Sequence, residues 1–198
     1  MQNIEYEAKF ISIDKDNVRE RLKLAGAKLV KPEFLQKRVV FNLPTGHEIS
    51  GGWLRVRDEA DKITMSLKVI SGSKIKDQKE ICLKIDNFQE AVKFLETIGC
   101  NKKSYQENRR ELWGFKDVEV AIDEWPFVEP FIEIESDSED KVKEVAKNLG
   151  FNYTQAFFGA TDIICQKEYG IPLDVINSIP EIRFDMKNPY LALTNLKI

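Results

Sequence analysis

Charged side chains alternate with neutral ones near the start of the chain. Glu5, Glu7 and Lys9 are separated by Tyr6 and Ala8. Side chains of a strand point alternately to its two faces, so a strand here would place the three charged groups on one face. Two carboxylates in that position repel each other unless a cation lies between them. For an isolated motif of this kind, a solvated strand face is the simpler interpretation.

Like-charged pairs with the same spacing recur later in the chain. Arg55 and Arg57 form one such pair, and Glu133 and Glu135 form another. Further charged positions on strand-like stretches are Lys68, Glu80, Arg109, Arg110 and Asp123. Like charges held this close are unfavourable unless a ligand of opposite sign completes the site. The recurrence therefore favours a binding site over several unrelated solvated faces.

The mixture of signs indicates which ligand would suit such a site. Paired carboxylates select a divalent cation, and paired guanidinium groups select phosphate or carboxylate oxygens. A triphosphate carries roughly four to five negative charges and is normally bridged to protein carboxylates by Mg²⁺. An entirely acidic site would indicate calcium, and an entirely basic one nucleic acid or sulfate. The mixed set predicts a metal-bound polyphosphate.

Composition restricts the class of protein. The 198 residues, with 42% hydrophobic and 32% charged side chains, are typical of a charge-rich globular protein with one large domain. A net charge of −3 argues against general nucleic-acid binding. Three widely spaced cysteines and a single histidine, His47 in a Pro/Gly-rich turn, argue against disulfides, zinc and a histidine triad. Without an apolar run of membrane-spanning length or a signal-peptide core, we expect a cytoplasmic protein with no membrane partner.

The elements that must position the charged groups are mostly strands. Alternation predicts strands at 3–12, 35–42, 52–58, 62–70, 78–85, 104–114, 117–124 and 130–136. Helices are predicted from Asp14 or Asp16 to Gly26, over 87–98, and from Ser138 to Gly150. Short turns between most strands indicate a largely antiparallel α+β domain. Residues from about 169 onward are less periodic, and we expect them to form an extension packed on that domain.

These motifs, in this order, resemble the CYTH superfamily, also called triphosphate tunnel metalloenzymes. The resemblance spans about residues 3–168 and rests on Glu5-x-Glu7-x-Lys9, Trp53–Arg57, Leu67-Lys68, Glu80, Tyr105–Trp113, Ile122-Asp123 and Phe131–Glu135. It implies a closed or nearly closed β-tunnel (barrel) of eight antiparallel strands with helices packed outside. We therefore expect residues 1–168 to form this tunnel and residues 169–198 to be a C-terminal extension.

The resemblance also assigns roles to the charged residues. It implies divalent-metal binding, by Mg²⁺ or Mn²⁺, at Glu5, Glu7, Asp123, Glu133 and Glu135. It implies phosphate binding at Lys9, Arg55, Arg57, Lys68, one of Arg109 and Arg110, and the late Lys167. Glu80 would support these groups. We expect Glu7, Glu135, Lys68 and Arg57 to contribute to catalysis.

Two assignments on the strand at 104–114 depend on which of its side chains point into the tunnel. Counting back from Trp113 favours Arg110 over Arg109 as the inward arginine, but a slip of one residue reverses this. The family often has a lysine two residues before the arginine, and here that position is Asn108. One cation is therefore absent or supplied from elsewhere, with Arg38 and Lys103 as candidates.

The expected function is metal-dependent hydrolysis of a small-molecule triphosphate, such as inorganic tripolyphosphate, thiamine triphosphate or a nucleoside triphosphate. One alternative is a class IV adenylyl cyclase, in which the ribose hydroxyl attacks the α-phosphate of ATP. A second is a non-catalytic module that binds polyphosphate or nucleotide. Relatives include dimers, so a homodimer is compatible with the resemblance, although the sequence identifies no dimer surface.

Overall fold

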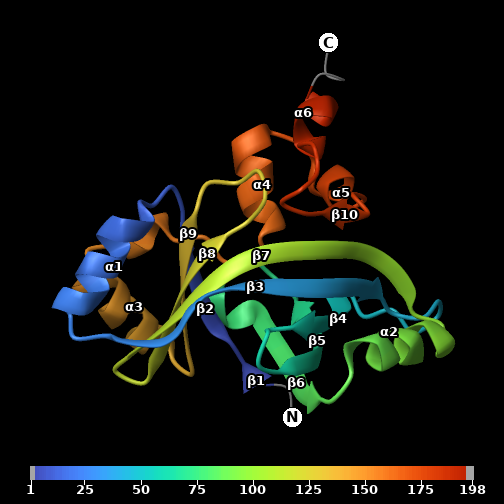
Figure 1. The fold of residues 1–198 in the computed structure, drawn as a ribbon, viewed down its shortest axis with the longest axis horizontal. Coiled ribbons are helices and arrows are strands. Elements are labelled where there is room, and N and C mark those ends of the chain that lie inside the picture. Colours follow the sequence, from blue (N-terminus) through green and yellow to red (C-terminus); the bar gives the residue numbers. More distant parts are fainter. Residues whose placement is uncertain (1–2, 195–198) are drawn as a thin grey trace.

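A computed structural model describes residues 3–194 (Figure 1). The strands are β1 (Asn3–Ile4), β2 (Tyr6–Phe10), β3 (Lys28–Asn42), β4 (Gly52–Asp58), β5 (Ile63–Ile70), β6 (Gln78–Ile85), β7 (Asn101–Phe115), β8 (Val118–Glu124), β9 (Phe131–Ser136) and β10 (Glu181–Ile182). The α-helices are α1 (Lys15–Leu24), α2 (Phe88–Thr97), α3 (Glu139–Asn148), α4 (Asp162–Tyr169), α5 (Leu173–Ile176) and α6 (Pro189–Thr194).

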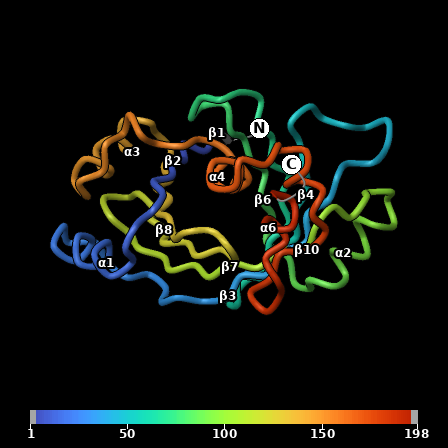
Figure 2. Tube along the Cα trace, turned by 90° about the horizontal axis from the view of Figure 1, so that it is seen from above, coloured from blue at the N-terminus to red at the C-terminus, as the bar shows by residue number. Residues whose placement is uncertain are grey.

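The N-terminal segment closes the sheet. Neighbouring strands follow the order β1-β6-β5-β4-β3-β7-β8-β9-β2, and its two ends, β1 and β2, are consecutive in the chain and separated only by Glu5. The Glu5 N–H donates to the Gln78 carbonyl at 3.1 Å, and the Gln78 side chain donates to the Glu7 carbonyl at 3.3 Å. Counting β1 and β2 as one strand gives the eight-stranded antiparallel tunnel predicted from the sequence. The strands surround a common centre when seen from above (Figure 2).

Both faces of β2 are buried. Ala8 and Phe10 pack outward into an apolar core with Val18 and Leu22 of α1 and the buried face of α3. The opposite face carries Glu7, which is 4% exposed, and Lys9, which is 2% exposed. These charged side chains therefore point into the tunnel, and the structure excludes a solvated strand face.

Helices cover the outside of the tunnel at two places. The helices α1 and α3 lie beside each other at one side, and α2 lies at the other (Figures 1 and 2). The Asp14 side chain accepts from the Asn17 N–H at 2.7 Å and thereby caps the first turn of α1, as its sequence predicts. The apolar face of α2 packs on outward residues of β3 and β4, such as Phe41 and Val56.

One long strand begins earlier than the sequence pattern indicates. We expected a strand from residue 35, but β3 starts at Lys28. Its first half pairs with β7 through register shifts on either side of Lys31, and most of its side chains are exposed. It also contains Pro32, which cannot donate to a ladder. Without alternating burial, this half has no period-two pattern for sequence reasoning to detect.

The C-terminal segment, residues 162–194, packs as a second layer on the tunnel (Figure 1). Its buried side chains Ile164, Ile176 and Tyr190 form one cluster with Trp125 and Phe131 of the tunnel domain. The strand β10 pairs in parallel with β7 at Tyr105, whose N–H donates to the Pro180 carbonyl at 2.9 Å. The boundary predicted after residue 168 lies at the end of α4 and stays a prediction.

No helix within residues 3–194 is long and apolar enough to cross a membrane.

The packing at the start of β4 leaves no room for a side chain at Gly51. Its φ is +69°, and a Cβ atom there would overlap the Ile70 carbonyl oxygen, which belongs to the backbone. Gly46 also has a positive φ, +86°, but a Cβ atom there would meet no other atom. We expect Gly51→Ala to lower the free energy of unfolding by more than about 3 kcal/mol, and Gly46→Ala by about 1 kcal/mol. Urea denaturation measures both, and equal losses would contradict this account.

Candidate functional site

The inner faces of the strands enclose a charged cavity of about 830 Å³. Most of the site residues predicted from the sequence line it: Glu5, Glu7, Lys9, Arg55, Arg57, Lys68, Glu80, Arg110, Glu133 and Glu135. They come from β2, β4, β5, β6, β7 and β9, together with Glu5, which joins β1 to β2. The closed sheet therefore brings together charges that lie up to about 130 residues apart in the sequence.

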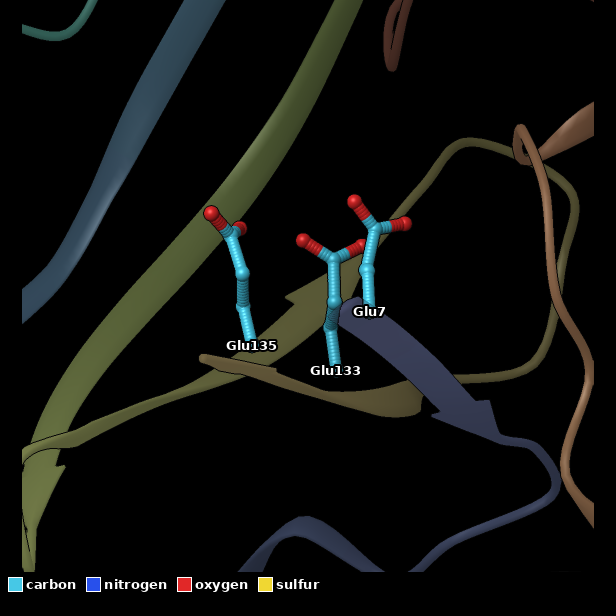
Figure 3. A group of neighbouring side chains, drawn as sticks. All are labelled: Glu7, Glu133 and Glu135. Carbon is cyan, nitrogen blue, oxygen red and sulfur yellow. The ribbon is translucent and has the colours of Figure 1, made fainter. Parts of the chain in front are cut away.

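Three carboxylates form the acidic part of the site. One oxygen each of Glu7, Glu133 and Glu135 lies within 4.8 Å of the others (Figure 3). The register explains this proximity, because Glu7 is paired directly with Glu135, and Lys9 with Glu133, between β2 and β9. Glu7 and Glu133 are buried, and Glu135 is partly buried.

The acidic group is unevenly neutralised: burial disfavours the Glu133 carboxylate, but Lys9 and Arg110 nevertheless lower its pKa. Burial, reinforced by Glu5 and Glu133, raises the pKa of Glu135 to about 7. Burial also raises the pKa of Glu5, although Lys68 opposes the shift. Oxygen ligands at this spacing and with this charge are what Mg²⁺ and Mn²⁺ bind in proteins. The donor set thus fits a divalent cation.

Two lysines link the carboxylates to the rest of the cavity. Lys9 Nζ contacts the Glu7 carboxylate, lies 3.2 Å from Glu133 Oε2, and donates to the Gly159 carbonyl at 2.8 Å. Lys68 Nζ lies 3.0 Å from Glu7 Oε2 and 3.0 Å from Glu5 Oε2. Burial lowers the pKa of Lys9, although Glu133 opposes this shift. These contacts neutralise part of the acidic charge.

Arginines dominate the wall formed by β3 and β4. Arg55 lies 3.1 Å from Glu80, and Arg57 lies 2.9 Å from Glu59. Burial, together with repulsion from Arg55 and Arg57, lowers the pKa of Arg38 well below its usual value. A guanidinium group nevertheless stays protonated in proteins, so this wall holds cations close together at a cost in free energy.

Several buried donors on this wall have no acceptor. Within the described residues, Arg38 Nε, Arg55 Nε and the indole Nε1 of Trp125 are buried without a hydrogen-bond partner, and all three side chains line the cavity. A buried donor left unpaired costs about 1–3 kcal/mol. Phosphate oxygens are strong acceptors that suit guanidinium donors. The wall therefore fits an anion with several oxygens.

The structure distinguishes the two neighbouring arginines of β7. Arg110 lines the cavity, donating from Nε to Asp123 at 2.9 Å and lying 3.0 Å from Glu133. The Arg109 side chain points the other way, is 44% exposed and pairs with Glu124 at 2.9 Å. Arg110 is therefore the inward arginine, as counting back from Trp113 predicted.

Besides Arg109, two predicted site residues are not part of the cavity wall. Asp123 is fully buried behind it, where it accepts from Arg110 and, at 2.8 Å, from Asn108, and it lies outside the group of three carboxylates. In this arrangement it positions Arg110. Lys167 is exposed on α4, with its Nζ 4.5 Å from the Phe157 ring centroid. The structure does not bring Lys167 together with the other charged residues.

Asn108 explains how the missing lysine is replaced. Its side-chain oxygen accepts a hydrogen bond from Arg38, and its side-chain nitrogen donates to Asp123. Arg38 thereby places its cation on the cavity wall, and Lys103 lines the same cavity further along β7. Both candidates named from the sequence are therefore present.

Sequence reasoning missed three acidic residues that also line the cavity: Glu59, Glu119 and, at the start of α4, Asp162. Glu119 lies four residues before Asp123 on β8, which places both on the same strand face. Glu59 lies two residues after Arg57 and pairs with it. The alternation of charged side chains, which identified the other site residues, was a sufficient signal for Glu59 and Glu119.

The adjacent arginines allow a matched test of the buried network. We expect Arg110→Ala to lower the free energy of unfolding by roughly 3 kcal/mol, because Asp123 then stays buried with less compensation. Arg109→Ala removes an exposed pair and should cost less than about 1 kcal/mol. Urea denaturation of both variants measures the difference. A larger loss of unfolding free energy for Arg109→Ala than for Arg110→Ala would show that Arg109, and not Arg110, points into the tunnel.

Comparison with known proteins agrees with this architecture. The CYTH domain model matches residues 3–162. A Methanocaldococcus jannaschii protein named "Putative adenylate cyclase" is 30% identical over 171 residues, covering 84% of this chain and 96% of that protein. The solved structure of a "putative adenylate cyclase" from Vibrio parahaemolyticus matches with a TM-score of 0.70 at 13% identity, covering 84% of this chain and 99% of that one.

A further solved structure has the same fold. It is a "putative adenylyl cyclase" from Hippeastrum, described as having a dominant triphosphatase activity, and it matches with a TM-score of 0.54 at 15% identity. The match covers 88% of this chain and 99% of that one. The family match covers most of the chain and includes every cavity-lining residue predicted from the sequence. The chain is therefore a member of the CYTH domain family.

Proposed function

We propose that this protein is a divalent-metal-dependent hydrolase of a triphosphate, acting inside the tunnel. The observation that carries the proposal is the placement of Glu7, Glu133 and Glu135 in one cavity with a wall that carries Arg38, Arg55 and Arg57. Carboxylates alone would suit a bare cation, and arginines alone would suit a bare anion. A metal-bound triphosphate satisfies both.

Arg38, Arg55 and Arg57 would hold the phosphate chain. Their neighbouring guanidinium groups repel one another, so phosphate oxygens would relieve that repulsion and accept from the unpaired donors. Arg110 is fixed by Asp123 and would present its remaining donors to the same chain. The guanidinium groups thus orient the phosphorus atoms relative to the carboxylates.

Binding would exchange partners within the cavity. Lys9 and Lys68 now neutralise Glu7, and Lys9 also contacts Glu133. When both ligands are present, these lysines would transfer to phosphate oxygens, and the carboxylates would hold Mg²⁺ or Mn²⁺. The metal would supply positive charge at the phosphate oxygens and favour ionisation of the attacking water. Every buried charge then keeps a partner of opposite sign.

A second candidate is cyclase activity on ATP, favoured by the name of the Methanocaldococcus jannaschii relative. Both reactions need the same charged groups and differ in which phosphorus is attacked and by which oxygen. A binding module without turnover would need the same arginine wall but no group of three carboxylates. Product analysis distinguishes all three.

The direct test is to incubate the protein with tripolyphosphate, thiamine triphosphate or ATP in the presence of Mg²⁺ or Mn²⁺. We expect orthophosphate to be released, because the site holds the phosphate chain and a water-activating metal. Cyclic AMP with pyrophosphate would instead establish the cyclase. Tight binding of every compound without turnover would instead support the non-catalytic binding module.

Site variants tie any turnover to the tunnel. We expect Glu7→Gln and Arg57→Ala each to lower kcat/KM by at least roughly 100-fold while the circular dichroism spectrum is unchanged. Glu144→Gln, on the exposed surface of α3, is the matched control and should retain wild-type activity. Full activity in both tunnel variants would refute the assignment of the site.

Metal binding can be measured without turnover. A cation that binds only the folded protein stabilises it by about 2.7 kcal/mol at 100 times its Kd. We therefore expect added MgCl₂ to raise the Tm of the wild type and of Glu144→Gln, and to have a much smaller effect on Glu133→Gln. An equal rise in Glu133→Gln would exclude that carboxylate as a ligand.

A further inference from the structure

The C-terminal segment does more than cover the tunnel, because it lines part of the same cavity. Side chains of α5 and the residues that follow it, namely Leu173, Ile176, Asn177, Ile179 and Ile182, border the cavity next to Lys103 of β7. We call this region the roof compartment. We propose that it binds the organic part of the substrate, a neutral heteroaromatic group such as a nucleobase, so that the substrate is an organic triphosphate and not inorganic tripolyphosphate. This inference rests on the proposed function.

The cavity is too large for phosphates alone. Its volume, about 830 Å³, lies in the range of roughly 300–1,000 Å³ that encloses whole organic ligands. Along the inner face of β7, Arg110 and Ser104 are six positions apart, which corresponds to roughly 20 Å of strand. Three linked phosphates at the arginine wall would leave the far part of this span empty.

The wall of the roof compartment is apolar, whereas the wall of the phosphate site is charged. Ile176, Ile179 and Ile182 are at most 8% exposed to solvent, yet each borders the cavity. Val40 of β3 adds to this aliphatic surface. Aliphatic side chains offer no donors to phosphate oxygens, whereas they pack well on a flat ring.

The polar groups of the compartment are few and already oriented. Lys103 Nζ donates to Asn177 Oδ1 at 2.7 Å, and Asn177 Nδ2 donates to Asp162 at 2.7 Å. The ammonium group retains further donors, and the carboxylate retains an acceptor oxygen. A donor and an acceptor beside an apolar wall can read the edge of a heterocycle that carries complementary groups.

Charge favours a neutral group over a cationic one. Lys103 and Asp162 balance each other through Asn177. The face of Trp125, which would otherwise attract a cation, is already occupied by Arg38 at 4.6 Å from the ring centroid. A cationic ring, such as that of thiamine, would meet two cations, Arg38 and Lys103, and one carboxylate, that of Asp162, whose charge Lys103 already balances.

Neighbouring residues of α5 provide a matched test on the full chain. Leu173 borders the cavity, whereas Asp174 is exposed and does not. Leu173→Asn keeps the side-chain size and adds polarity, and Asp174→Asn is the control. Leu173→Trp fills the compartment while keeping it apolar, so it covers the case in which the asparagine variant fails to fold.

Two readouts are measured for each protein with Mg²⁺. The first is the ratio of kcat/KM for ATP to that for tripolyphosphate. The second is the calorimetric affinity for a non-hydrolysable ATP analogue relative to that for tripolyphosphate. We expect both ratios to fall at least roughly tenfold in Leu173→Asn and Leu173→Trp, and to be unchanged in Asp174→Asn. The wild type should also prefer ATP to thiamine triphosphate.

The outcomes separate this inference from the proposed function. If the wild type hydrolyses triphosphates but both Leu173 variants keep wild-type ratios, the roof compartment is not the organic subsite, and the hydrolase stands. A wild-type preference for tripolyphosphate or thiamine triphosphate also overturns the inference. If no compound is hydrolysed but the Leu173 variants still weaken binding of the ATP analogue selectively, the subsite stands and the hydrolase fails.

Discussion

Burial of many charges inside one closed sheet is the constraint on which the rest of this structure depends. A charged group removed from water is tolerated only when it is paired and hydrogen-bonded. Glu7 is paired with Lys9 and Lys68, and Arg110 with Asp123 and Glu133. The carboxylates and the arginines nevertheless remain incompletely compensated, each in its own part of the cavity. The proposed ligands would complete the compensation of these charges.

Closure of the sheet is what makes this burial possible. An open sheet would leave the charged face in water, where side chains at this spacing would be solvated. Here a single N-terminal segment pairs with β6 through its first residues and with β9 through the rest. Gln78 bridges the change of partner by donating to the Glu7 backbone. Because the same segment carries Glu7 and Lys9, the strand pairing that closes the tunnel also places these two site residues.

The second layer extends the site chemically. The tunnel supplies charge, and the C-terminal segment supplies apolar surface with an oriented polar rim. A substrate with a charged end and a neutral flat end has matching surroundings along the cavity. Differences in this layer would let members of one fold act on different triphosphates while the charged groups stay the same, since function depends on the site and not on the fold alone.

The sequence by itself determined the fold class and most of the charged site. Alternation of side chains is a local property of a strand, so Glu5, Arg55 and Glu133 could each be assigned to a face from neighbouring residues alone. The resemblance then joined those faces into one tunnel. The exposed first half of β3 lacks alternation, so the sequence predicted only the second half of this strand, from residue 35.

Only the tertiary structure decided which charged groups meet. The register of β7 with β8 places Asp123 behind Arg110, and the pairing of β3 with β7 lets Arg38 reach Asn108. Lys167 stays outside because of how α4 packs. The roof compartment likewise exists only because residues after 170 fold back onto β7. Local patterns determine the direction of a side chain, whereas its partners depend on packing between segments that no local pattern encodes.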